Sequence, residues 1–161
     1  LVASQPFSEP ALRYSELQFN PDLSPEQVQA LRAAKVLIID QIGLLSKLYR
    51  YAGLCWIGGG FGAGIHNLLE AAVYGKALAF GPNYVRFTEA HELMALDAAR
   101  SFTTVKPFVQ YLSELIAEYA DSKAPNSRTY QSAPQAKTYV QQQKGATAQI
   151  LQWIAQQGYL S

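Results

Sequence analysis

The sequence is poor in cysteine and in charge, and it has no long apolar run. Its single cysteine, Cys55, excludes a disulfide framework and a zinc site built from several cysteines. Charged residues make up only 16% of the 161 positions, against roughly 25% in an average globular protein, while 49% are hydrophobic. This composition excludes a disordered chain and a coiled coil. No apolar stretch reaches the roughly 18 residues that a membrane-spanning helix needs.

The chain also lacks an excess of positive or of negative charge. Thirteen basic residues face twelve acidic ones, and no block of Lys or Arg stands out. We therefore expect no nucleic-acid partner, because such partners are held by clustered positive charge. No segment resembles a signal peptide, so the protein is expected to be soluble. Because the chain begins with Leu1 and not with Met, we expect it to be a piece of a longer protein.

The length fits a single domain over residues 1–161. We expect residues 1–34 to form an irregular lead-in, in which Ser24, Pro25 and Glu26 mark the start of a short helix. Residues 35–120 are expected to form an α/β core. Residues 133–157 are expected to form C-terminal helices, broken near Gly145, after a polar loop over residues 121–132.

Short apolar runs alternate with helical patterns through the core. Apolar runs predict strands at 36–39, 54–57, 77–80 and 102–105, the first of them buried on both faces. Apolar spacing predicts helices at 43–51, 65–74, 87–96 and 107–119. This alternation is typical of an α/β fold, a Rossmann-like open parallel sheet with flanking helices.

A glycine-rich segment, residues 58–64, follows the second predicted strand and precedes a predicted helix. Ligands of open α/β sheets bind beyond the carboxyl ends of the strands. Glycines let the backbone approach a ligand closely, and a helix N-terminus attracts phosphate. The alternative is a tight crossover that merely needs left-handed backbone.

Polar residues follow the glycines. His66 and Asn67 fall in the first turn of the predicted helix, and Glu70 lies one turn further, where its carboxylate could accept hydrogen bonds from a ribose. A structural role is the alternative, with Asn67 as a helix cap and Glu70 as a favourable charge near the helix start. Two more loops, residues 40–43 and 81–84, are expected at the same edge of the sheet.

Other cofactor motifs fit poorly. Gly58, Gly60 and Ala63 satisfy a loose dinucleotide fingerprint, but no acidic residue follows about 20 positions on to hold an adenine ribose. The sequence has no Asp-x-Asp pair, and its two histidines stand far apart, so we expect no metal site. Cys55 lies in an apolar run and fits a small core residue better than a nucleophile.

Three segments in order are recognisable: residues 36–51 (VLIIDQIGLLSKLYRY), 58–75 (GGGFGAGIHNLLEAAVYG) and 80–84 (FGPNY). Together they resemble the 3-deoxy-D-manno-octulosonic acid (Kdo) transferases of lipopolysaccharide assembly. The resemblance covers about residues 13–96 and, more loosely, the tail from Gly145. It implies the C-terminal, donor-binding half of a GT-B glycosyltransferase. The family's opening strand is missing or altered before Arg13, and Asp97 with the two alanines after it replaces a glycine-rich turn.

The resemblance implies a binding site for the nucleotide sugar CMP-Kdo. The nucleotide would be held by Ile42, Gly43, Gly59, Gly60, Phe61, Gly62, Gly64, His66, Asn67 and Glu70. The donor sugar would lie near Pro82, Asn83 and Tyr84. Within these sets the glycine segment and helix start would cradle the phosphate, Glu70 would bind the ribose, and Ile42 with Gly43 would contact cytosine.

The resemblance also implies an inverting, metal-independent transfer of Kdo to a lipid A precursor, with no cofactor and with CMP as the leaving group. The catalytic base, the acceptor surface and the membrane anchor would lie in a separate N-terminal domain, so no catalytic residue is expected here and the isolated piece should be inactive. The parent enzyme would act at the cytoplasmic face of the inner membrane. Two alternatives stay open: another Rossmann-like nucleotide-binding fragment, such as part of an oxidoreductase, and a non-catalytic interaction domain.

Overall fold

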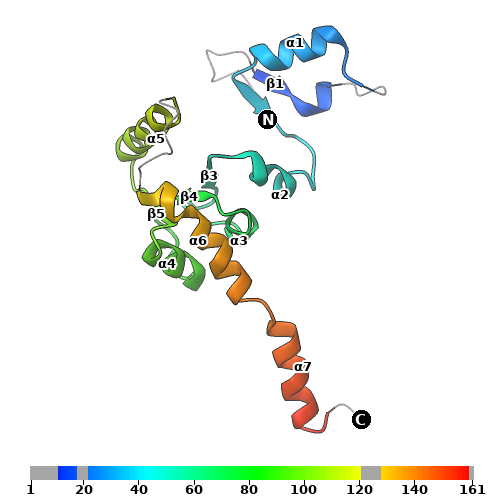
Figure 1. Cartoon of the computed structure of the whole chain (residues 1–161), viewed down its shortest axis with the longest axis vertical. Coiled ribbons are helices and arrows are strands. Elements are labelled where there is room, and N and C mark those ends of the chain that lie inside the picture. Colours follow the sequence, from blue (N-terminus) through cyan, green and yellow to red (C-terminus); the bar gives the residue numbers. More distant parts are fainter. Residues whose placement is uncertain (1–10, 18–21, 121–127, 160–161) are drawn as a thin grey trace. The chain divides into compact units, whose positions relative to one another are not determined.

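The computed structural model describes residues 11–17, 22–120 and 128–159 (Figure 1). The chain forms two compact units, Leu1–Leu48 and Tyr49–Ser161, and each is described by itself. The predicted limits of the lead-in, core and C-terminal helices stay predictions.

The first unit holds a two-stranded parallel sheet. Strand β1 (Ala11–Arg13) pairs with β2 (Val36–Ile38), with Ala11 opposite Val36. Between them lie a 3-10 turn, η1 (Tyr14–Glu16), and helix α1 (Pro25–Ala33), and helix α2 (Leu45–Leu48) follows β2. The short helix expected after Ser24 is confirmed as α1. Strand β1 was not expected from the sequence.

Helix α1 begins with a capping box. The hydroxyl of Ser24 accepts a hydrogen bond from the backbone N–H of Gln27 (3.3 Å), and the side-chain oxygen of Gln27 accepts one from the backbone N–H of Ser24 (2.9 Å). Pro25 occupies the first helical position, where its missing N–H does no harm. The start of this helix is therefore determined by local sequence.

The second unit is built on a three-stranded parallel sheet in the order β3-β4-β5. The strands are β3 (Leu54–Ile57), β4 (Ala77–Phe80) and β5 (Ala99–Ser101). The connections and the chain beyond β5 hold η2 (Tyr49–Tyr51), α3 (Leu69–Ala72), α4 (Thr88–Ala95), α5 (Val105–Ala120), α6 (Arg128–Gln142) and α7 (Ala146–Gln156). The α/β class with parallel sheets and flanking helices is thus confirmed.

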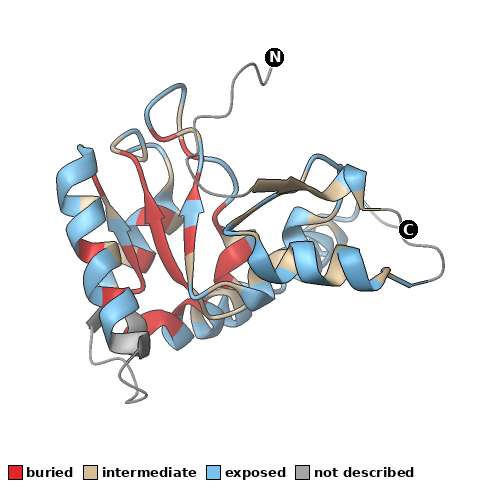
Figure 2. Cartoon of the chain, turned by 90° about the horizontal axis from the view of Figure 1, so that it is seen from above, coloured by how far each residue is buried: buried red, intermediate tan, exposed pale blue. Residues whose placement is uncertain are grey.

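Helices cover both faces of this sheet. On one face Leu78 and Phe80, both fully buried, share a core with apolar residues of α3, α4 and α6. On the other face Ala79 packs with Tyr111 and Leu115 of α5. Figure 2 shows buried residues gathered on the strands and on the helix sides that face them. A central strand flanked by strands and covered on both faces must be apolar throughout, and all four residues of β4 are buried.

Several predicted elements differ from the observed ones. The helix predicted for residues 65–74 is wrong in extent, because residues 65–68 form a loop and α3 is a single turn. The strand predicted at 102–105 is wrong, since β5 ends at Ser101 and Phe102 packs beneath α5. Strand β2 is not buried on both faces, because Leu37, in the two-stranded sheet, is 45% exposed.

The way in which α4 ends explains why β5 begins at Ala99 and not at the predicted residue 102. Asp97 takes a left-handed conformation (φ 56°), its N–H bonds to the Met94 carbonyl, and the N–H of Ala98 bonds to the Leu93 carbonyl. This pair of bonds is the usual C-terminal cap of a helix, with aspartate where glycine is commonest. The small side chain of Ala99 then enters the sheet opposite Leu78.

Candidate functional site

Two loops meet at the carboxyl edge of the second unit's sheet. The glycine loop, residues 58–64, follows β3, and the second loop, residues 81–84, follows β4. Because β3 and β4 are parallel neighbours, both loops leave the sheet at the same edge. Their backbones lie in close contact: a Cβ added to Gly60 would lie 2.6 Å from the nitrogen of Gly81. Only glycine permits so close an approach.

Hydrogen bonds join these loops. The N–H of Asn83 donates to the carbonyl of Gly60 (2.8 Å), and the N–H of Ile65 donates to the carbonyl of Asn83 (3.3 Å). The side-chain amide of Asn83 donates to the carbonyl of Gly62 (2.7 Å). Asn83 therefore holds the glycine loop in place from the neighbouring loop.

The glycine loop is a turn closed on itself. Gly59 (φ +85°) and Gly64 (φ +140°) have left-handed backbone, which side chains disfavour. The N–H groups of Gly62 and Gly64 both donate to the carbonyl of Gly59. In the described part of the chain the N–H groups of Phe61 and Ala63 have no such partner. The loop thus offers backbone donors at the edge where ligands of this fold class bind.

Beyond the glycine loop, three exposed polar side chains follow. The amide of Asn67 donates to a carboxylate oxygen of Glu70 (3.0 Å), and its oxygen accepts from the N–H of Leu69 (3.1 Å). His66 is exposed, and its backbone N–H donates to the carbonyl of Gly58 (3.0 Å). Residues 65–68 form a loop, and α3 begins only at Leu69. The structure therefore brings Asn67 and Glu70 together. The side-chain oxygen of Asn67 also accepts its hydrogen bond from Leu69, the first residue of α3.

Aromatic side chains flank the glycine loop. Phe61 is 61% exposed, and its ring stacks on that of Trp56 at 6.3 Å. Trp56 lies edge-on to Phe108 of α5 (4.6 Å). An exposed ring that is fixed by a second ring is a flat apolar surface beside the loop.

The side chains of the second loop are mostly engaged in contacts with the rest of the protein. The ring of Tyr84 packs on Phe80 (5.3 Å) and on His91 (5.1 Å). Pro82 accepts a hydrogen bond from the N–H of Tyr84 (3.0 Å). Asn83 faces the glycine loop as described above. Tyr84 and Asn83 therefore stabilise the loops through contacts within the protein.

The first unit carries the other two predicted positions. Ile42 and Gly43 lie in a turn after β2, where Ile42 is fully exposed and Gly43 has φ +90°. Nearby, the hydroxyl of Ser15 donates to a carboxylate oxygen of Asp40 (2.6 Å), and the Ser15 N–H donates to the other (3.0 Å). Mainly the Ser15 hydroxyl, with a smaller contribution from Arg13, holds the pKa of Asp40 below its usual value.

Sequence reasoning missed Arg86, which follows the second loop. Its guanidinium donates to the carbonyl of Ala63 in the glycine loop (2.8 Å). With Gly62, Asn83 and Val85, these two residues line a surface hollow of about 220 Å³. The position of Arg86 could have indicated this contact, because Arg86 is the first basic residue after β4 and β4 ends at the edge where the glycine loop lies.

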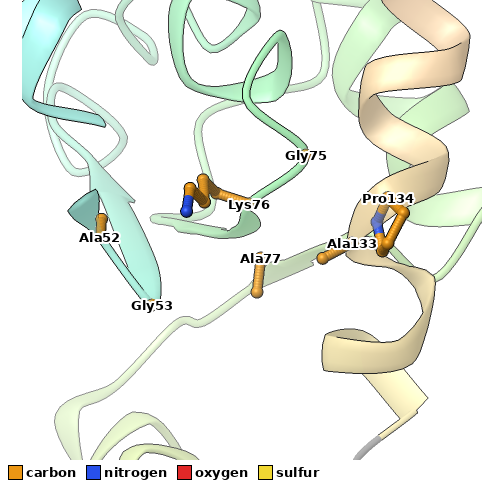
Figure 3. Close-up of a pocket in the computed structure, with 7 residues that line it drawn as sticks. All are labelled: Ala52, Gly53, Gly75, Lys76, Ala77, Ala133 and Pro134. Atoms are coloured by element: carbon orange, nitrogen blue, oxygen red, sulfur yellow. The ribbon is translucent and has the colours of Figure 1, made fainter. Parts of the chain in front are cut away.

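A different hollow lies at the opposite edge of the sheet, where β3 and β4 begin. It measures about 110 Å³, and Figure 3 shows Lys76 and Pro134 among the residues around it. The thiol of Cys55 is buried nearby in β3, and burial raises its pKa to about 11. A thiol with so high a pKa stays protonated at neutral pH, which supports its interpretation as a core residue.

Within the residues that the structure describes, no three His, Cys, Asp or Glu side chains gather as metal ligands would. None of the described helices has the length and apolar character needed to cross a bilayer.

Comparisons with known proteins support the predicted resemblance. No protein-family model matches the chain. The 3-deoxy-D-manno-octulosonic acid transferase of Chlamydia pneumoniae is 34% identical over 84 residues, which cover 50% of this chain and 19% of that enzyme. The transferase of the same name from Rickettsia prowazekii is 31% identical over 80 residues, covering 49% of this chain and 17% of the relative. A bifunctional glycosyltransferase/methyltransferase of Fusobacterium nucleatum is 26% identical over 118 residues, or 72% of this chain and 17% of the relative.

The chain thus spans less than a fifth of the length of these curated relatives. Among solved structures, the C-terminal CMP-Kdo binding domain of WaaA from Acinetobacter baumannii matches with a TM-score of 0.61 at 22% identity, over 83% of this chain and 61% of that one. The chain is therefore similar in sequence to the Kdo transferases, as the three motifs indicated, and it has the fold of the C-terminal half of a GT-B glycosyltransferase.

Proposed function

We propose that this chain is the donor-binding part of a Kdo transferase and that it binds CMP-Kdo at the carboxyl edge of the second unit's sheet. One observation carries the proposal. Two of the motifs on which the resemblance rests, at 58–75 and 80–84, supply the glycine loop and the second loop, and the fold joins them directly through Gly60 and Gly81. Both loops thus lie together at the edge where ligands of open α/β sheets bind.

The chemistry of the loops fits a nucleotide. The N–H groups of Phe61 and Ala63, which have no partner among the described residues, can donate to phosphate oxygens. The carboxylate of Glu70 is exposed and can accept hydrogen bonds from ribose hydroxyls while Asn67 holds it in place. The remaining proposed contacts are those given above: Gly59, Gly62, Gly64 and His66 near the phosphate, Ile42 and Gly43 with the cytosine, and Pro82, Asn83 and Tyr84 near the sugar.

The reaction is proposed for the whole enzyme. Kdo leaves CMP and is joined to a lipid A precursor with inversion, without a metal or cofactor, while a base on an N-terminal domain takes the acceptor proton. The bond from the anomeric carbon to the phosphate oxygen breaks, and CMP keeps the electron pair. Backbone donors of the glycine loop stabilise the negative charge that develops on the phosphate. One turn of helix contributes less, since α3 is only four residues long.

The test is a titration of this chain followed by backbone amide signals, with CMP as ligand and AMP and NAD as competitors. We expect CMP to shift signals of residues 59–70 and 81–84, and also that of Gly43. Glu70→Gln should weaken CMP binding by about tenfold or more, because a hydrogen bond to a charged group contributes about 1.5–3 kcal/mol.

Glu114→Gln is the matched control. Glu114 also has a carboxylate bonded by a neighbouring side-chain amide, that of Gln110 (3.0 Å), but it lies on α5. If AMP or NAD bound as tightly as CMP, the chain would be another Rossmann-like nucleotide binder. If no nucleotide shifted any signal, the glycine loop would be structural and the proposal would fail.

A further inference from the structure

The guanidinium of Arg86 is held at the rim of the glycine loop. One of its N–H groups donates to the Ala63 carbonyl, and a terminal nitrogen lies 3.6 Å from where a Cβ of Gly64 would be. An arginine fork carries five N–H donors, so one bond to a carbonyl leaves several for a further acceptor. The side chain is thus fixed at one point and open at the others.

The positive charge of Arg86 is not neutralised by the protein. Arg86 takes part in no ion pair among the described residues, and the hollow of about 220 Å³ beside it is lined without any carboxylate. The same hollow is lined by Ala63, whose backbone N–H has no partner in the described part of the chain. A cation and an unpaired amide donor beside one small hollow make a place for an oxyanion.

We propose that Arg86 binds an oxyanion of the donor substrate in this hollow, together with the backbone of the glycine loop. The proposal rests on the donor-binding function proposed above and adds a residue to it. An activated 2-keto sugar acid carries two such groups on its anomeric carbon, a phosphate and a carboxylate. Each presents two oxygens that share one negative charge, and a guanidinium recognises such a pair with paired N–H donors.

The competing interpretation is that Arg86 only ties the second loop to the glycine loop through Ala63. The two roles differ in whether the charge of residue 86 matters. If Arg86 only ties the two loops together, its loss displaces the glycine loop, and Arg86→Lys binds CMP no better than Arg86→Gln. If Arg86 binds an oxyanion, CMP binding is weakened in Arg86→Gln and partly retained in Arg86→Lys, while cytidine binding is unchanged.

The experiment measures dissociation constants of the full 161-residue chain for CMP, cytidine, free Kdo and inorganic phosphate by amide-signal titration at fixed ionic strength. The variants are Arg86→Gln, Arg86→Lys and the control Lys144→Gln, which removes one exposed positive charge in the turn before α7. Arg86 is exposed, and the amide spectrum of each variant shows whether it is folded.

We expect Arg86→Gln to weaken CMP binding by about tenfold, as for a lost charge-assisted bond, and to leave cytidine binding and the control unchanged. Arg86→Lys should retain part of the affinity, because it keeps the charge but not the fork. A loss for CMP assigns the phosphate, and a loss for free Kdo assigns the carboxylate.

Unchanged affinity of Arg86→Gln for both CMP and Kdo would overturn the inference. An equal loss of CMP affinity in Arg86→Gln and Arg86→Lys, or an equal loss for CMP and cytidine, would overturn it as well. The wild type could also bind neither CMP nor cytidine, while inorganic phosphate or Kdo shifts the Ala63 signal in an Arg86-dependent way. That result would support the oxyanion site and refute the proposed donor function. Silence toward every probe would overturn both.

Discussion

Replacing Gly60 with alanine should force the two loops of the site apart. The new Cβ would lie 2.6 Å from the nitrogen of Gly81, 2.7 Å from its Cα and 3.0 Å from its carbonyl carbon. All three are backbone atoms, so no side-chain rotation relieves the contact. The gap must widen from 2.6 Å to the 3.4 Å at which ordinary contact begins.

A separation of that size also breaks the hydrogen bond from the Asn83 N–H to the Gly60 carbonyl, which is 2.8 Å long. Overpacking of a well-packed site costs about 1–3 kcal/mol, and a lost hydrogen bond costs about 1 kcal/mol. We therefore expect Gly60→Ala to lower the free energy of unfolding by about 2–4 kcal/mol.

Gly62→Ala in the same loop is the matched control. Its Cβ would meet only the carbonyl oxygen of Gly59, at 3.6 Å, and its φ is not left-handed. A glycine-to-alanine change without strain stabilises by about 0.4–1 kcal/mol through the unfolded chain. Urea unfolding followed by Trp56 fluorescence, in a Trp153→Phe background, measures both variants. If Gly60→Ala were as stable as Gly62→Ala, the backbone approach of the loops, and with it the joined site, would be refuted.

Three further predictions concern groups outside the site. At about pH 8 the native thiol of Cys55 should resist a disulfide reagent and react only in urea, because burial raises its pKa to about 11; rapid reaction of the native chain would contradict this. Burial, and then the bond to the Glu92 carboxylate, raises the pKa of Tyr139 to about 12. The neutral phenol is thereby favoured in the folded state, so its stabilisation is complete below about pH 10 and is lost between about pH 10 and 12. The unfolding free energy of the wild type should therefore fall relative to that of Tyr139→Phe across that window, because the wild type loses there a stabilisation that the variant lacks, and parallel curves would argue against it. Ser24→Ala should destabilise α1 by about 1 kcal/mol, seen as faster amide exchange in that helix and not in α4.

Local signals in the sequence were strong enough for some elements. The bounds of β3 and β4 follow from two apolar runs, and β4, which is covered on both faces, is buried at every residue. The start of α1 follows from Ser24 and Pro25, whose capping chemistry is local. The glycine loop was recognisable as a candidate site because several glycines directly after a strand indicate a backbone that is left-handed or that approaches a ligand closely.

Other features could not be inferred from spacing. Ile65 and Leu68 are buried at helical spacing but lie in a loop, in which the N–H groups of Ile65 and His66 bond to the carbonyls of Asn83 and Gly58. A burial pattern reports which side chains face the core and not which hydrogen bonds the backbone makes. Strand β5 was missed since Ala99 carries little strand propensity and enters the sheet through its small size.

By itself the sequence determined the α/β class, the central strands, the glycine loop and the resemblance to the Kdo transferases, because each of these is written in consecutive residues. Only the tertiary structure decided that Gly60 touches Gly81, that Asn83 braces the glycine loop and that Arg86 reaches Ala63 from 23 residues away. These contacts depend on the parallel pairing of β3 with β4. Strand pairing is a long-range choice set by how the whole sheet packs, and no local pattern in the chain encodes it.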